Sequence, residues 1–399
     1  MKMKRTLNLD FTLIEVFFCI IYAVVVSFAS PILLSKGYSN STIGIILAAG
    51  SLSTVIAQPL LADYMDTHPK VSTFKVSIGA SAVMAILLGI IMLIARVSLF
   101  ISLAFIAIIT VFWAISPLLT ALCFKLSDTG YHVNYGSARA FGSLAYALSC
   151  SFCGYLSENY GSSSLIITGI LALAVFAFIM YLTCIHYNKA KNSAIVLVDT
   201  KKEETIVSFK EFINHNVIFL FAMIGVMLFS YGSSVFGNFA KQIIDGIGGN
   251  DADMGNILSF SALLELPVLF AFDAIHKRFR CVTLLKIAAI FYVLKLLAMY
   301  LARNVFAFYL AQLFQIFQYP LFLAAIIAYV NEIMPKNEAT RGQAIYNITT
   351  NISSIISSFT AGFIIDSYGS HITLLVSLIL SIIGVIIFIP CINKVENDH

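Results

Sequence analysis

The chain has 399 residues, of which 60% are hydrophobic and 11% charged, with a mean hydropathy of +0.93. A soluble domain carries roughly a quarter charged residues, so this composition excludes a soluble globular protein and indicates a polytopic membrane protein. The formal charge of +4 resides mainly in the loops, where it suits an anionic membrane surface and gives no indication of a nucleic-acid partner.

Runs of about 20 apolar residues predict twelve transmembrane helices. Their approximate ranges are 10–34, 42–65, 73–95, 98–126, 136–157, 164–187, 216–243, 254–275, 282–302, 305–332, 341–367 and 371–392. Most Lys and Arg residues fall in loops on the same side of the membrane as the N-terminus, so the positive-inside rule predicts that both termini are cytoplasmic. We therefore expect a multi-pass protein of the cell membrane, of the bacterial inner-membrane type, without an obligatory protein partner.

One long polar loop separates two sets of six predicted spans. The sequence thus predicts an all-α protein with six-helix bundles at 1–187 and 216–399, joined by a cytoplasmic linker at 188–215. In secondary transporters built from two such halves, the substrate site lies near the bilayer midplane.

Acidic residues mark the first two predicted spans. Glu15 lies about one turn inside span 1, where a carboxylate either reaches the inner headgroups or faces a cavity and can carry a proton. Span 2 ends in Asp63-Tyr-Met-Asp66, and Lys70 follows in the loop. A carboxylate at a helix C-terminus is disfavoured by the helix dipole, so Asp63 and Asp66 require cationic or N-terminal partners.

Arg139 begins the fifth span, within Asn134-Tyr-Gly-Ser-Ala-Arg139-Ala-Phe-Gly142. A guanidinium in hydrocarbon costs roughly 3 to more than 10 kcal/mol, so it needs a partner, water or a route to the surface. Gly142 and Tyr146 share its helical face, which is small and polar. We expect a cation and a ring directed into the bundle, with snorkelling of Arg139 to the inner surface as the alternative.

The loop after span 2 resembles the glycine–aspartate–basic motif of the major facilitator superfamily, with Ala62 in place of the glycine. This resemblance implies the twelve-helix fold of that superfamily and a gating role for Asp66 and Lys70, apart from the substrate site.

Two further segments are similar to the lactose permease and oligosaccharide–proton symporter branch: Gly44 to Leu60 in span 2, and Tyr135 to Gly142 in span 5. In that branch the arginine matched by Arg139 binds sugar hydroxyls, and the aromatic residue matched by Tyr146 stacks on the sugar ring. The branch pairs the arginine with a glutamate in span 4, which this chain lacks.

In the second half, Glu265 lies near mid-depth of span 8, beside Pro267. It is a candidate for binding substrate or carrying a proton. Lys295 in span 9 matches the position of a family arginine that assists proton release, so the resemblance implies a role in coupling. A structural ion pair between Glu265 and Lys295 is the alternative.

Span 10 carries Gln312, Gln315 and Gln318, which form one slanted stripe on a helix and offer donors and acceptors to a solute. In the symporter relatives the matching positions hold lysine, histidine and glutamate, whereas amides cannot titrate. Packing between helices is the alternative for this stripe. Asn347 and Asn351 in span 11 are further candidate solute contacts.

The sequence contains no GxxxxGK[ST] loop for ATP and no HExxH or Cys/His spacing typical of a metal site, so we expect no cofactor and no metal. The sequence and the resemblance together predict a secondary active transporter for a small polar neutral solute, a sugar or glycoside, with symport of protons left open. Alternatives are a nucleoside or other metabolite permease, or a drug efflux carrier. An enzyme is disfavoured because no nucleophile or metal cluster is evident.

Overall fold

The structure, a computed structural model, describes residues 2–68, 70–129, 133–193, 212–213 and 215–398. By their contacts the residues form two compact units, Met1–Thr200 with Met254–Ser259, and Lys201–Asp253 with Phe260–His399. The predicted linker at 188–215 falls largely on 194–211 and 214, outside the described residues, and the predicted domain limits stay a prediction.

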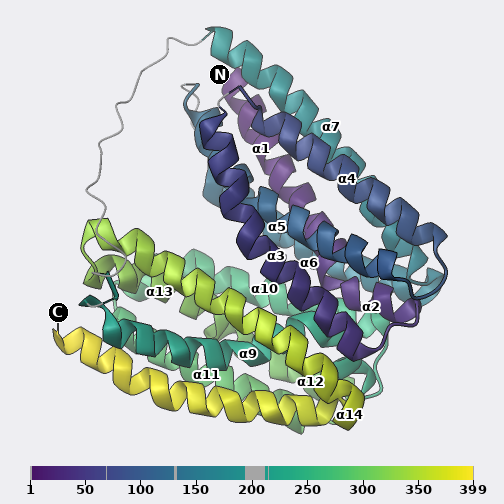
Figure 1. Ribbon diagram of the computed structural model, residues 1–399. Helices are drawn as coiled ribbons and strands as arrows, with labels where there is room; N and C mark the ends of the chain where they lie inside the picture. The colour runs from purple at the N-terminus through teal and green to yellow at the C-terminus, as the bar shows by residue number, and fades with distance from the viewer. Residues whose placement is uncertain (1, 69, 130–132, 194–211, 214, 399) are drawn as a thin grey trace. The chain divides into compact units, whose positions relative to one another are not determined.

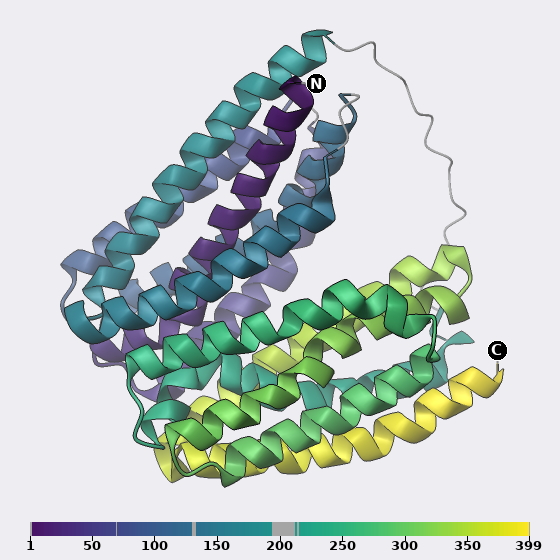
Figure 2. The same ribbon diagram turned by 180° about the vertical axis from the view of Figure 1, so that it is seen from behind.

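The first unit is built from helices that pack in pairs. They are α1 (Lys2–Ile21), the π-helix η1 (Tyr22–Ser27), α2 (Ala29–Ser35), α3 (Asn40–Thr67), α4 (Thr73–Leu93), α5 (Leu99–Ser127), α6 (Tyr135–Tyr160) and α7 (Ser163–Ser193). α1 packs on both α6 and α7, α3 packs on α5, and α4 on α7. Figures 1 and 2 show the teal α7 beside the purple α1 from both sides.

The second unit has the remaining helices, except that residues Met254–Ser259 of α10 group with the first unit. They are α9 (Val217–Asp245), α10 (Asp251–His276), α11 (Cys281–Leu301), α12 (Val305–Gln312), the 3-10 helix η2 (Leu313–Phe317), α13 (Tyr319–Ile333) and α14 (Lys336–Asp398). Local sequence sets where these helices begin: Asn250 and Asp253 form a reciprocal capping box before α10, and Asn304 caps α12 through the amide of Ala307.

α14 is two membrane helices in one continuous element. Its 63 residues would extend about 95 Å if straight, roughly three times the hydrocarbon thickness. Gly369 has φ +83°, a left-handed conformation that glycine adopts without steric penalty, and there the chain reverses. Figure 1 shows α14 as two legs meeting at a sharp bend, with the yellow leg leading to the C-terminus.

Among the described residues the twelve predicted spans are all helical, which confirms the predicted fold class. Ten segments are long and apolar enough to cross a bilayer. One of these, Glu338–Lys394, contains two spans, and the more polar α6 supplies the twelfth. Among the described residues the first span contains the π-helix η1 and the tenth contains the 3-10 helix η2, and the seventh, α9, is kinked at Phe239.

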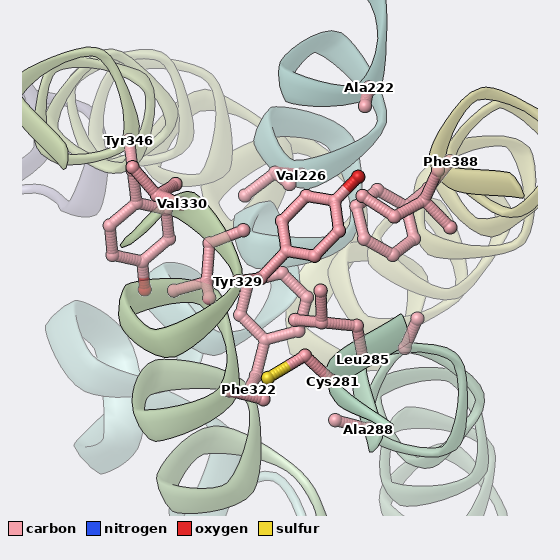
Figure 3. Packing of buried hydrophobic residues seen from close by; sticks show 14 of the residues in the cluster. Ala222, Val226, Cys281, Leu285, Ala288, Phe322, Tyr329, Val330, Tyr346 and Phe388 are labelled. Atoms are coloured by element: carbon pink, nitrogen blue, oxygen red, sulfur yellow. The ribbon is translucent and has the colours of Figure 1, made fainter. Parts of the chain in front are cut away.

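Close backbone packing holds α9 against the second leg of α14. A Cβ placed on Gly225 would lie 2.7 Å from the carbonyl oxygen of Gly384 and 2.8 Å from the Cβ of Phe388. Phe229 and Phe388 extend this contact into the apolar core of the unit, part of which Figure 3 shows. Small residues at such positions let transmembrane helices approach within van der Waals contact of their backbones.

We expect Gly225→Val to loosen the α9–α14 contact, because its side chain would overlap backbone atoms that cannot move aside. Overpacking of this kind costs about 1–3 kcal/mol. The measurement is the midpoint of thermal unfolding in detergent, with Gly237→Val as the matched control, since nothing lies within 4 Å of a Cβ at Gly237. Equal midpoints for the two variants would contradict the packing described here.

Candidate functional site

In the first unit, Arg139 on α6 lies beside Glu15 on α1. Arg139 Nη1 is 3.5 Å from Glu15 Oε2; the glutamate side chain is 4% exposed and the arginine side chain 55%. The helices meet closely here, since a Cβ on Gly142 would lie 2.9 Å from Cys19 Sγ and 3.2 Å from the Glu15 carbonyl oxygen. The carboxylate partner that the resemblance places in span 4 is therefore supplied by span 1.

Tyr146 lies about two turns after Arg139 on α6 and contacts the interrupted first span. Its hydroxyl is 3.0 Å from Ser27 Oγ, and its ring stacks on Tyr22 with centroids 5.1 Å apart. Both partners belong to η1, whose wider turn reorients their side chains; π-helical turns occur frequently at functional sites. Tyr22 covers one face of the Tyr146 ring, so only the other face is left to stack on a solute.

Tyr22 belongs to a larger aromatic group that the sequence analysis did not single out. Phe112 stacks on Tyr22 at 6.0 Å, and Trp113 meets it edge-on at 5.5 Å. Gln58 Nε2 donates to the carbonyl oxygen of Trp113 over 2.9 Å, which ties α3 to α5. The single tryptophan of the chain, within a span rather than at an interface, was the available signal.

In the second unit, the break in span 10 coincides with the three glutamines. Gln312 ends α12, Gln315 lies in η2, and Gln318, with φ −93° and ψ −98°, precedes α13. A 3-10 helix has three residues per turn, so side chains at i and i+3 eclipse. The predicted slanted stripe is thus an aligned row from Gln312 to Gln315, and Gln318 follows it outside the 3-10 helix. The three members of this glutamine row are 0%, 7% and 1% exposed, respectively.

Gln312 and Gln318 bind different helices of this unit. Gln312 Oε1 accepts from Ser261 Oγ of α10 over 2.7 Å, and Gln318 Nε2 donates to Ser233 Oγ of α9 over 2.7 Å. Gln318 Oε1 is buried and accepts no hydrogen bond from the described residues. The glutamines therefore make hydrogen bonds between helices, as the packing alternative expects. Gln318 Oε1 remains as an acceptor without a donor among the described residues.

Gln315 bridges Lys295 of α11 and Glu265 of α10. Lys295 Nζ donates to Gln315 Oε1 over 2.5 Å, and Gln315 Nε2 donates to Glu265 Oε1 over 2.7 Å. The ion pairs found among the described residues do not join Lys295 to Glu265 directly. An amide is suited to this position because its oxygen accepts from the ammonium while its nitrogen donates to the carboxylate.

The remaining predicted residues are not part of these clusters. Asn347 and Asn351 are exposed on α14, and no hydrogen bond found among the described residues joins them to the glutamine row. Asp66 in the last turn of α3 and Lys70 after it are also exposed, without an ion pair among the described residues. Their predicted roles stay predictions.

The two clusters offer a solute many hydrogen-bonding groups and little net charge. Arg139 is compensated by Glu15, and Lys295 by Glu265 through Gln315. What remains for binding is the guanidinium edge, amide groups and aromatic faces.

Comparison with known sequences places the chain within one family. A sequence model of the MFS_1 like family matches residues 11–376. No curated protein matches the sequence.

Solved transporter structures have the same fold. A mutant form of the nucleoside transporter NupG has 13% identity and a TM-score of 0.77, covering 96% of this chain and 99% of that chain. An inward-facing bacterial homolog of the human lysosomal transporter Spinster has 13% identity and a TM-score of 0.72, covering 100% and 98%. The POT family transporter PepTSo has 10% identity and a TM-score of 0.68, covering 99% of each chain. At such identities the likeness concerns the fold alone.

Removal of the bridging amide by Gln315→Leu should destabilise the second unit. The change leaves the buried Lys295 and the partly buried Glu265 without their shared partner, and each hydrogen bond to a charged group contributes about 1.5–3 kcal/mol. Unfolding midpoints measure the effect, with Gln343→Leu as the control, because its bond to Asn331 is exposed. A loss no larger than that of the control would show that the bridge does not hold the helices.

In a double-mutant cycle on Arg139 and Glu15, we expect the two single variants to lower the stability by different amounts. Arg139→Gln should destabilise more than Glu15→Gln, because it leaves a buried carboxylate alone, whereas Arg139 is half exposed and can be hydrated. Solvent screening places the coupling near the lower end of the range of about 0.5–3 kcal/mol. Additive single-variant effects in unfolding measurements would contradict the pair.

Proposed function

The chain belongs to the MFS_1 like family and is a multi-pass transporter of the major facilitator superfamily; on this basis we propose that it moves a small polar neutral solute, a sugar or glycoside, by alternating access. The interruption of span 10 at its glutamines carries the proposal. Non-helical backbone at membrane depth is tolerated only where it is buried in protein or lines a water-filled cavity. We infer that the break in span 10 exists because its glutamines bind a solute.

Gln318 is our principal candidate for solute contact in the second unit. Its buried Oε1 has no hydrogen-bond donor among the described residues, and an unsatisfied buried acceptor costs about 1–3 kcal/mol. A hydroxyl group of the solute would satisfy it. Gln312 and Gln315 would support this contact by holding the row against α10 and α11.

In the first unit, Arg139 and Tyr146 are the proposed contacts. A guanidinium carries five donors in a planar fork, and half of the Arg139 side chain is exposed. Glu15 would neutralise it so that an uncharged solute is preferred. The ring of Tyr146, supported from one side by Tyr22, would stack on the apolar face of a sugar.

We propose Glu265 as the site of proton coupling. As a carboxylate it accepts from Gln315; as a carboxylic acid it loses the charge that makes this bond strong. Protonation would therefore release Gln315 and weaken its hold on Lys295, loosening the broken helix. Because the three residues join α10, η2 and α11, a proton at Glu265 is communicated to three segments. The coupling requires no titratable group in the glutamine row.

A nucleoside is the second candidate solute. The stacked group of Phe112, Tyr22 and Tyr146 suits a planar base, and one structural neighbour carries the name nucleoside transporter. We also propose cytoplasmic termini, from the loop distribution of Lys and Arg.

Uptake into proteoliposomes tests the proposal, with a panel of neutral sugars, glycosides and nucleosides, with and without a pH gradient. Glu265→Gln should abolish accumulation driven by the gradient while leaving downhill equilibration. Gln318→Leu should raise KM about 2- to 10-fold, the effect of one neutral hydrogen bond. Gln343→Leu is the control and should match wild type.

Three outcomes separate the hypotheses. Wild-type uptake that ignores the gradient would rule out proton coupling. A KM unchanged in Gln318→Leu would remove that residue from the solute site. Extrusion of amphipathic cations, with no transport of the neutral panel, would favour drug efflux over solute uptake.

A further inference from the structure

Three side chains with metal-binding atoms converge at one end of the second unit. His276 is in the last turn of α10, Cys281 is the first residue of α11, and Glu332 is next to the last residue of α13. His276 Nε2 lies 3.0 Å from Glu332 Oε1, and His276 Nδ1 lies 3.5 Å from Cys281 Sγ. One ligand atom from each residue can be chosen so that all three lie within 4.8 Å of one another.

We propose that His276, Cys281 and Glu332 form a binding site for a transition-metal ion of the Zn²⁺ type. Zinc binds nitrogen, sulfur and oxygen ligands at about 2.0–2.3 Å, which places neighbouring tetrahedral ligands about 3.3–3.8 Å apart. The two short contacts use different nitrogens of the His276 ring, and an ion would bind only one of them. With one ligand atom per residue the three atoms lie within 4.8 Å of one another, so rotation of the exposed His276 and Glu332 side chains would bring them to this spacing. A mixed imidazole, thiolate and carboxylate set favours Zn²⁺ over Mg²⁺ or Ca²⁺, which prefer oxygen ligands.

The cavity gives an ion access to the three side chains. It also has room for a fourth ligand. The three residues line a cavity of about 370 Å³. The side chains of His276 and Glu332 are 34% and 50% exposed, so both can adjust, whereas Cys281 is buried. In Figure 3 the Cys281 sulfur points from α11 toward the helix that carries Phe322 and Tyr329. Three protein ligands leave the fourth position to water or a small anion.

The basic residues around the cavity limit which groups can hold a metal ion there. Lys277, Arg278 and Arg280 line the same cavity and would repel a divalent cation held by neutral groups. A thiolate and a carboxylate together neutralise Zn²⁺, so the complex adds no net charge among these cations. The thiolate is therefore essential to the site, and the basic residues would attract an anion to the open position.

The site would act on transport through the helices that it joins. α10 carries Glu265, α11 carries Lys295, and α13 follows η2 with Gln315. A metal ion that ties their ends together would restrain the movements that alternating access requires, so Zn²⁺ should inhibit uptake. This consequence rests on the proposed function, whereas metal binding does not.

Binding is measured on the purified full-length protein in detergent, after treatment with a chelator. Co²⁺ is titrated first and then displaced by Zn²⁺. We expect one equivalent per chain, with a thiolate-to-cobalt absorption band that is absent from Cys281→Ser. Glu332→Gln and His276→Ala should bind roughly 10- to 100-fold more weakly or worse, since even the loss of a residue that supports a metal ligand has that effect.

Matched controls are Cys391→Ser, Glu158→Gln and His371→Ala, which should bind as wild type does. Glu332→Gln changes an exposed side chain, so it keeps the test valid if Cys281→Ser does not fold. Zn²⁺ should also raise the unfolding midpoint of wild type and not of Glu332→Gln. Absence of a cobalt–thiolate band, or equal affinity in Glu332→Gln and Glu158→Gln, would overturn the site. Zinc binding without any solute uptake would contradict the proposed function and leave the site standing.

Discussion

The structure of the second unit depends on how a lysine and a glutamate are both kept within a transmembrane bundle. Neither charge can remain in a low-dielectric interior without a partner, and their side chains do not meet directly. The amide of Gln315 resolves this by presenting its oxygen to Lys295 and its nitrogen to Glu265. A continuous α-helix would turn consecutive glutamines of the row progressively away from this line. The 3-10 segment keeps Gln312 and Gln315 closer to this line, and Gln315, which lies within the segment, makes both contacts of the bridge.

The first and tenth spans share a design, although they lie in different units. Each is interrupted where it carries its polar or aromatic side chains: η1 at Tyr22 and Ser27, and η2 at Gln315. The helices around them pack tightly through small residues, as at Gly142 and Gly225. Irregular backbone in a rigid frame is a means of concentrating conformational freedom at a binding site, and that is how we interpret the two breaks.

Each of the two clusters has a net charge close to zero. Arg139 is compensated by Glu15 within one unit, and Lys295 by Glu265 within the other. Charges that are already compensated contribute directional hydrogen bonds rather than net attraction for ions, which is why we favour a neutral solute. The His276–Cys281–Glu332 group differs, because its thiol and carboxyl groups become a dianionic pair only when a cation joins them.

The sequence by itself determined the spans, the fold class and which polar residues lie within the spans, because hydropathy and helix length are local properties. It also predicted that Arg139, Glu265 and the glutamines lie within the spans. It could not show that Glu15 is the partner of Arg139, that Gln315 separates Lys295 from Glu265, or that Glu332 approaches Cys281. Those contacts join helices far apart in the chain, and the helical period defines the faces of one helix without specifying which faces meet. Only the tertiary structure decided them.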